Sequence, residues 1–493
     1  MIIIRLLFII SLLTAANSHR CNFTEGLSQT RHLHRPSLGY SFSISNGYFK
    51  IHYDLDGPNA IENIDYDTNG IPDYIEEVVS AATASYDFIR SLGYDDTYIS
   101  DCDESILDTD NLYHCNHFGG DSYYDIYIKD LPASSSYVKY GENLLDNSSL
   151  GTSYILIDNG YTEDEYHTKG EDAMKVTIAH EFFHAIQRSY RIDPGNEVFF
   201  YEMSSVWMED LIFPEVNDYL DEAWTDEFFD NPNVNITDYP TVKGYSLGLY
   251  AHYLSSVIDS DQNYSIILEM WDEFKNESSA LTAINSVLES NYGLDFTRTF
   301  IDFCSLNFFN GYYSDEQNEF YYHPDQVYAQ PITIPVMIDF EPNVSIDKSF
   351  SGQNLNVFGF DLDPNLIFDI GVSDDLLSSD IMGNIVLFSQ NNLDNQEVLS
   401  LGSFDEEYTS FESIYFILGS ELPIDISFDV FFCNEQKTGD VMQDCIINVL
   451  DYIKMVDYIL QFEICDSVYD LNDDNECNIL DTIELVSQIM ETP

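Results

Sequence analysis

Hydrophobic and polar positions change their spacing along the chain, and each spacing predicts a different kind of structure. From about residue 40 to residue 330, segments that alternate apolar and polar side chains are interspersed with longer segments of helical period. The first kind predicts strands at 48–53, 124–128 and 154–157, and the second predicts helices at 74–92, 171–190, 198–213, 244–258 and 279–290. Because strands and helices do not alternate regularly, this order predicts an α+β fold.

The pattern becomes β-rich between about residues 331 and 432. Short alternating runs at 355–361, 385–388, 413–418 and 424–432 are separated by turns of Asp, Asn, Ser and Gly. This arrangement predicts a small β-sandwich.

The last zone, residues 433–493, contains an internal repeat. Residues 448–460 align with residues 478–490, and each copy joins an acidic loop to an amphipathic helix. One copy is too small to bury its own apolar face, so the repeat predicts a small all-α unit in which the two copies pack together.

Residues 1–18 have the pattern of a secretory signal peptide. Arg5 is their only charged residue, residues 6–13 are apolar apart from one Ser, and residues 16–18 form a small-x-small cleavage site. No later segment is long and apolar enough to span a membrane. We therefore expect a secreted protein, extracellular or attached to a cell surface.

The predicted division of the chain is a signal peptide (1–18), a first domain (19–330), a β-sandwich-like domain (331–432) and the repeat (433–493).

All eight cysteines lie outside the signal peptide, and an even number in an exported protein predicts disulfide bonds. The spacing favours a local bond between Cys102 and Cys115. The cysteines expected to crosslink the C-terminal zone are Cys433, Cys445, Cys465 and Cys477.

The charge balance excludes two classes of partner. The chain has 18 Lys and Arg against 87 Asp and Glu, a net charge of −69. Nucleic acids and anionic membranes are bound largely through Lys and Arg, so neither is expected as a partner. So many carboxylates are suited to binding cations and to keeping the protein soluble in salt.

The segment His180-Glu181-Phe182-Phe183-His184 lies in the helix predicted at 171–190. Histidines four residues apart share one helix face, so both imidazoles can bind one zinc ion. A catalytic zinc needs a third protein ligand and an open position for water. Zinc lowers the pKa of that water, and Glu181 is placed to take its proton as general base.

The third ligand is predicted to be Glu202, on the helix at 198–213, which a short loop would return to the histidines. Glu209, two turns further on, is expected to hold a histidine ring or the ligand helix, and Glu209 as the ligand is the alternative. Such a site also needs an electrophile for the oxyanion. Residues 244–253 offer Tyr245, Tyr250, His252 and Tyr253, of which Tyr245 is the preferred candidate.

Residues 65–76 match the twelve-residue loop of a helix-loop-helix calcium site. Gly70 stands at the turn, and oxygen ligands stand at each expected position. The predicted ligands are Asp65, Asp67, Asn69, the Ile71 carbonyl, Asp73 and Glu76.

Each C-terminal repeat contains a related loop. The second has all five side-chain ligands, namely Asp470, Asn472, Asp474, Asn478 and Asp481, with Asn475 at the glycine position. Asn tolerates the left-handed conformation required there. The first copy has Met442 and Cys445 at two key positions, so it is expected to bind calcium weakly through Asp440, Asp444, Asn448 and Asp451.

These motifs carry two resemblances. Residues 45–320 resemble a family of exported bacterial zinc metalloproteases of the gluzincin (thermolysin-like) kind, through residues 52–60, 65–74, 119–120, 157–161, 179–187, 202 and 207–209. This resemblance implies a zincin-type catalytic domain, made of a twisted sheet, an active-site helix and a helical lobe. It implies His180, His184 and Glu202 as zinc ligands, Glu181 as base and Tyr245 as a further catalytic residue. Residues 439–490 resemble a type I dockerin, which implies calcium binding and a cohesin-like partner.

The function predicted from these features is that of a secreted zinc endopeptidase. It would act on protein or peptide substrates and be tethered by its dockerin-like tail. The alternative is a catalytically inactive, calcium-stabilised surface binding or adhesion protein on a zincin scaffold. Intact Glu181 favours the enzyme, although metal-dependent hydrolysis of a non-peptide substrate stays open.

Overall fold

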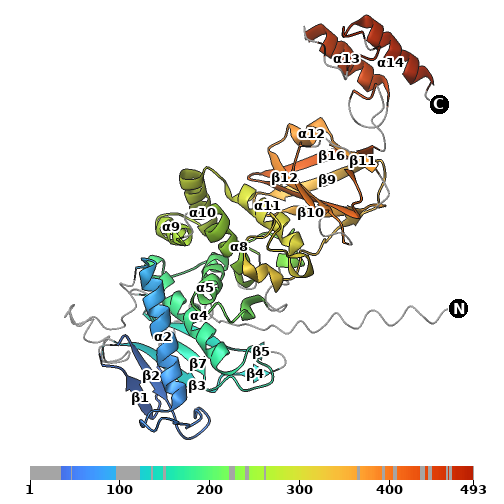
Figure 1. The fold of residues 1–493 in the computed structure, drawn as a ribbon. Coiled ribbons are helices and arrows are strands. Elements are labelled where there is room, and N and C mark those ends of the chain that lie inside the picture. Colours follow the sequence, from blue (N-terminus) through green and yellow to red (C-terminus); the bar gives the residue numbers. More distant parts are fainter. Residues whose placement is uncertain are drawn as a thin grey trace, which may run out of the picture. The chain divides into compact units, whose positions relative to one another are not determined.

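The computed structural model describes most of the chain from residue 35 to residue 491 (Figure 1). The described residues are 35–45, 47–95, 121, 123–134, 137–147, 151–220, 228–238, 244–259, 263–363, 367–390, 395–403, 408–433, 439–441, 447–461, 465, 469–472 and 474–491. The predictions about the signal peptide, the Cys102–Cys115 bond, Asp444 and Cys445 lie outside them.

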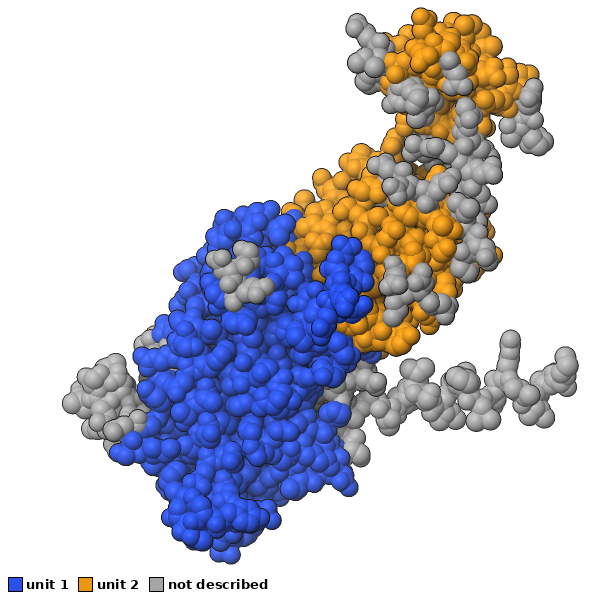
Figure 2. Space-filling view, in the orientation of Figure 1, with its two compact units in different colours: residues 1–228, 236–296, 315–330 blue, residues 229–235, 297–314, 331–493 orange. Residues whose placement is uncertain are grey.

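The chain forms two compact units (Figure 2). The first comprises residues 1–228, 236–296 and 315–330, and the second comprises residues 229–235, 297–314 and 331–493. The sequence placed all of residues 19–330 in one domain, whereas the contacts within the chain group residues 297–314 with the second unit.

The first unit is organised around a five-stranded sheet of order β1-β2-β3-β7-β6. Its strands are β1 (Tyr40–Ser43), β2 (Phe49–Tyr53), β3 (Tyr124–Lys129), β6 (Gly141–Asn147) and β7 (Thr152–Asp158). Strands β2, β3 and β7 are parallel, whereas β1 and β6 are antiparallel to their neighbours. A short hairpin pairs β4 (Ala133–Ser134) with β5 (Tyr137–Val138). All three strands predicted in this part of the chain are confirmed.

Helices α2 and α4 pack against the sheet, and α5 packs against α4 (Figure 1). The helices are α2 (Asp73–Ser91), α4 (Gly170–Tyr190), α5 (Val198–Ile212), α8 (Gly248–Tyr253), α9 (Ser265–Phe274) and α10 (Ala280–Val287). The 3-10 helices of this unit are Asp218–Leu220 and Pro324–Val327, and π-helical turns extend α8 through Leu254–Ile258 and α10 through Leu288–Tyr292. The segment predicted as one helix at 244–258 is helical at residues 244–246, has a turn at Leu247, continues as α8 and changes its winding at residue 254.

The second unit contains two sheets that share one hydrophobic cluster. Their orders are β13-β12-β15-β10-β8 and β14-β11-β16-β9. The strands are β8 (Met337–Ile338), β9 (Asn343–Ser351), β10 (Asn356–Asp361), β11 (Ile367–Val372), β12 (Ile381–Phe388), β13 (Glu397–Ser400), β14 (Tyr408–Thr409), β15 (Ser413–Ser420) and β16 (Pro423–Cys433). Phe358 and Phe416 from one sheet meet Phe428 and Phe432 from the other. This is the sandwich packing that the alternating pattern predicts.

The remaining elements of the second unit are helical. They are α11 (Phe296–Leu306), 3-10 turns at Asn307–Phe309 and Gly311–Tyr313, α12 (Asp374–Leu377), α13 (Val449–Gln461) and α14 (Ile479–Glu491). Helices α13 and α14 pack together through Met455 and Leu485, so the two repeat copies share one small core. A disulfide joins Cys465 to Cys477, whereas Cys304 is buried and unpaired.

The predicted α+β class is confirmed for the described residues. The finer zincin-type assignment stays a proposal. Within the same residues, no helix combines the length and apolar character needed to cross a membrane.

Candidate metal centre

Helices α4 and α5 bring His180, His184 and Glu202 together. The two histidines lie one turn apart on α4, with imidazole centroids 4.7 Å apart. Glu202 Oε2 lies 3.1 Å from Nε2 of His180 and 3.5 Å from Nε2 of His184. All three side chains are at most 1% exposed, because α4 and α5 are buried on almost every face.

The other ring nitrogen of each histidine faces its own polar group. Nδ1 of His184 lies 2.7 Å from Gln187 Oε1, and the Gln187 amide nitrogen donates to the carbonyl of Tyr201 over 2.8 Å. Nδ1 of His180 lies 3.4 Å from Glu209 Oε2. Both Nε2 atoms are thereby turned towards Glu202, the orientation that metal-binding histidines need. Glu209 has the orienting position expected of it, whereas Gln187 was missed although it follows His184 by three residues on the same helix.

Electrostatics keep Glu202 ionised at neutral pH. Burial by itself would raise its pKa, but the charge of His184 and hydrogen bonds from both histidines lower the pKa of Glu202 to about 2. Burial disfavours the charged form of His180, yet hydrogen bonds to Glu202 and Glu209 raise the pKa of His180 to about 9. Burial lowers the pKa of His184, so this imidazole is neutral at neutral pH, the form that binds metals, and its charge acts on Glu202 only in acid.

The donor set fits a divalent metal ion. The candidate ligand atoms of His180, His184 and Glu202 lie within 4.8 Å of one another. Buried Glu202 Oε1 has no hydrogen-bond partner within the described structure, so its remaining lone pairs are available. Two imidazoles and one carboxylate are a ligand set of catalytic zinc, and three protein ligands leave a position open.

Glu181 lies beside the sheet edge, next to the first histidine. Its side chain is 1% exposed, and its carbonyl oxygen accepts a hydrogen bond from the Asn143 amide over 3.1 Å. Strand β6 comes so close that a Cβ on Gly141 would lie 2.9 Å from Glu181 Cγ and 3.1 Å from Oε1. The Glu181 side chain therefore occupies space that a side chain at position 141 would otherwise fill.

Tyr245 also lies near the histidines. Its ring centroid is 5.9 Å from that of His180, and the side chain is buried. The preceding Gly244 packs directly on α5, where a Cβ would lie 2.5 Å from Glu202 Cβ. Of the four residues considered as electrophile, His252 belongs to a different polar group, with Asp210, His323 and Asp325.

The two complete acidic loops have the same backbone hydrogen-bond scheme. Asp65 accepts the amide of Gly70 over 2.8 Å, and Asp470 accepts the amide of Asn475 over 2.7 Å. Both residues at the sixth position have positive φ, 90° at Gly70 and 64° at Asn475. Asn475 thus adopts the left-handed conformation expected for the glycine position.

The twelfth positions of the two tail loops are also alike. Asp481 accepts the amide of Asn478 over 2.8 Å, and Asp451 accepts that of Asn448 over the same distance. Among the described residues, however, the His, Cys, Asp and Glu side chains that converge closely enough to suggest a metal site do not include these loops. Calcium binding by the three loops therefore stays a prediction.

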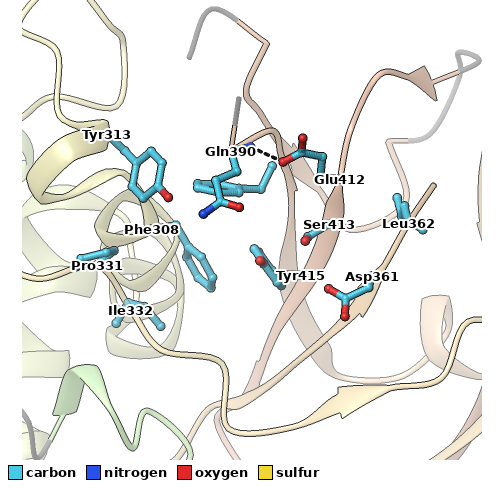
Figure 3. A pocket seen from close by; sticks show the side chains of 11 residues that line it. Phe308, Tyr313, Pro331, Ile332, Asp361, Leu362, Gln390, Glu412, Ser413 and Tyr415 are labelled. Atoms are coloured by element: carbon cyan, nitrogen blue, oxygen red, sulfur yellow. Dashed lines mark hydrogen bonds between the residues drawn. The ribbon is translucent and has the colours of Figure 1, made fainter. Parts of the chain in front are cut away.

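A cavity of about 670 Å³ lies within the second unit (Figure 3). It is lined partly by aromatic rings, including the stacked pair Phe308 and Tyr415, and partly by polar residues such as Gln390, whose backbone N–H donates to the Glu412 carboxylate over 2.9 Å. None of the predicted site residues lines it.

Comparisons with known proteins do not identify a family. No protein-family model matches the sequence, and no curated protein matches it. One match among solved structures is the crystal structure of Salmonella Typhimurium PliG, a periplasmic lysozyme inhibitor of g-type lysozyme. It covers 20% of this chain and 96% of that chain, with 9% identity and a TM-score of 0.15. Similarity this low carries no argument, so the metalloprotease and dockerin resemblances stay proposals.

Proposed function

We propose that this protein is a secreted zinc-dependent endopeptidase. The observation that carries the proposal is the buried convergence of His180, His184 and Glu202, with Glu181 beside the first ligand. Zinc held there would supply Lewis-acid chemistry and lower the pKa of a bound water towards neutrality.

The residues around the ligands have separate roles in the proposed reaction. Glu181 directly follows the first ligand on α4 and lies outside the converging triad, so we assign it the transfer of a proton from the attacking water to the leaving amine. Tyr245, near His180, supplies a hydroxyl that can stabilise the oxyanion as it develops. Gln187 and Glu209 hold the imidazoles in place.

Zinc and calcium should act on different properties of the full chain. We expect a chelator to abolish casein hydrolysis and to lower the melting temperature, because the hydrogen-bonded acidic loops gain stability from bound calcium by mass action. Zinc alone should restore hydrolysis, and calcium alone should restore the part of the melting temperature that the acidic loops contribute. The measurements are casein cleavage and thermal unfolding in each metal.

A loop variant serves as the control. Asp67→Ala should weaken the rise of melting temperature with calcium and leave the zinc content unchanged, since Asp67 accepts the Asn69 amide in the first loop. Zinc-loaded protein that cleaves no peptide substrate would favour the inactive binding protein instead. Identical melting curves with and without calcium would exclude calcium from the loops.

We further propose that the tail attaches the enzyme to a cohesin-like partner. The supporting observation is a duplicated apolar surface. Exposed apolar side chains occupy matching positions of both helices, Val449, Leu450, Ile453 and Leu460 in α13 and Ile479, Leu480, Ile483 and Met490 in α14. Large exposed apolar side chains gathered on one element are characteristic of binding surfaces.

Binding to a recombinant type I cohesin tests this surface. The full chain should bind in calcium, and Ile453→Asp combined with Ile483→Asp should weaken binding by about 100-fold or more, because it places charge in an apolar contact. Gln461→Asp combined with Ser487→Asp, at exposed polar positions of α13 and α14, is the charge-matched control and should leave binding unchanged. Unchanged affinity in the double variant would exclude this surface, whereas peptidase activity should not depend on it.

A further inference from the structure

A second group of metal-binding side chains lies in the first unit. It comprises Asp210 of α5, His252 of α8, and His323 and Asp325 at the start of the 3-10 helix Pro324–Val327. One ligand atom from each of the four lies within 4.8 Å of the others. Nothing in the proposed peptidase chemistry uses them.

The four side chains face one another at short range. Nε2 of His252 lies 3.1 Å from Asp210 Oδ2, and Nδ1 of His323 lies 3.7 Å from Asp325 Oδ2. The two imidazoles stack with centroids 4.1 Å apart. Asp210, His252 and Asp325 are at most 5% exposed, and His323 is partly buried.

Hydrogen bonds within the described structure leave part of this group unsatisfied. Neither His252 Nε2 nor Asp210 Oδ1 has a partner of suitable geometry, although both atoms are buried. A buried polar atom without a partner costs about 1–3 kcal/mol. Two such atoms on residues of one cluster indicate a missing ligand.

The charge state of the group agrees with a cation. Burial lowers the pKa of His252 to about 4 and that of His323 to about 3, so both imidazoles are neutral, the form that binds metals. Burial raises the pKa of Asp210 to about 7, although a hydrogen bond with Asp325 opposes the rise, and burial followed by the charge of Asp210 raises the pKa of Asp325. A divalent cation removes that penalty, since its charge balances the two carboxylates.

We propose that Asp210, His252, His323 and Asp325 form a second, structural zinc site. Two imidazole nitrogens and two carboxylate oxygens complete a four-coordinate shell, which is the closed arrangement of structural zinc and differs from the three-ligand centre on α4. Zinc–ligand bonds of about 2.0–2.2 Å would draw the ligand atoms to roughly 3.3–3.6 Å from one another.

The surroundings support this role. The Tyr219 hydroxyl donates to Asp325 and fixes one carboxylate, as residues around metal ligands do. His323 Nδ1 accepts the Asp325 amide over 3.3 Å and caps the 3-10 helix, and a zinc ion bound through this nitrogen would replace that hydrogen bond. The ion would thus connect residues 315–330 to α8 and to α5, the helix that carries Glu202.

The zinc content of the full chain tests the proposal. Protein purified with zinc and dialysed into metal-free buffer should retain about two zinc ions per chain by mass spectrometry, one for each group. His180→Ala with His184→Ala should retain about one, and Asp210→Asn with Asp325→Asn should also retain about one. Asp218→Asn, at a buried carboxylate outside both groups, is the control and should retain two.

Three results would overturn the proposal. They are zinc-free protein after loss of His180 and His184, two zinc ions in the Asp210/Asp325 variant, and a different ion at the four residues. If these variants do not fold, crystals of the unaltered protein decide the question by anomalous scattering at the zinc edge. A peak among the four side chains supports the site, and its absence shows a hydrogen-bonded network only.

Discussion

Glu181→Gln should lower kcat/KM for peptide hydrolysis by about 10²–10⁴-fold, the usual contribution of a general base. The amide has nearly the same shape as the carboxylate but cannot accept the proton. Because Glu181 is not part of the converging ligand set, the zinc content and the melting temperature should stay unchanged. Steady-state kinetics on a fluorogenic peptide, with metal analysis of the same samples, provides the measurement.

Glu171→Gln is the matched control for that substitution. Glu171 lies in the first turn of the same helix, is exposed and pairs with Lys175 on the surface. It should leave kcat/KM within about twofold, since exposed ion pairs contribute little. Full activity in Glu181→Gln would show that Glu181 is not the general base. It would not affect the proposed zinc ligands.

Glu202→Ala should abolish both zinc binding at the α4 centre and hydrolysis. The carboxylate faces Nε2 of both histidines, so its removal takes away the third ligand and the negative charge that balances the ion. Zinc per chain should fall by one, measured by mass spectrometry after dialysis, and cleavage of the fluorogenic peptide should fall to background.

Glu209→Ala distinguishes the role of Glu209 from that of Glu202, the other carboxylate of α5 that faces the histidines. Glu209 faces Nδ1 of His180, so its loss should weaken zinc binding by about 10–100-fold, as for other groups that orient a ligand. Complete zinc loss in Glu209→Ala with retention in Glu202→Ala would reverse the ligand assignment.

Features that depend on residues close together in the sequence could be predicted from the sequence. The four-residue spacing of His180 and His184 fixes their common helix face, and a short return to a second helix places Glu202 opposite them. Strands β2, β3 and β7 of the first unit and β10, β12, β15 and β16 of the second follow from the apolar runs in the sequence, whereas the other strands were not predicted.

Features that depend on contacts between residues far apart in the sequence could not be predicted in the same way. His323 and Asp325 approach Asp210 only through the fold, and no spacing pattern connects them. The turn at Leu247, which interrupts the helix predicted at 244–258, could not be predicted because the helical period continues through it. The grouping of residues 297–314 with the sandwich likewise depends on tertiary contacts, including those of Asn384 with Asp302 and Ser305.

Gly141 and Gly244 bear on which substitutions the protein can tolerate. Neither residue supplies a ligand or a proton, yet each allows backbone to approach a functional glutamate, Glu181 or Glu202, more closely than any side chain would permit. Selection for activity should therefore restrict both positions about as strongly as the ligands themselves. A search for related proteins would gain discrimination by requiring these two glycines together with the His-Glu-x-x-His segment.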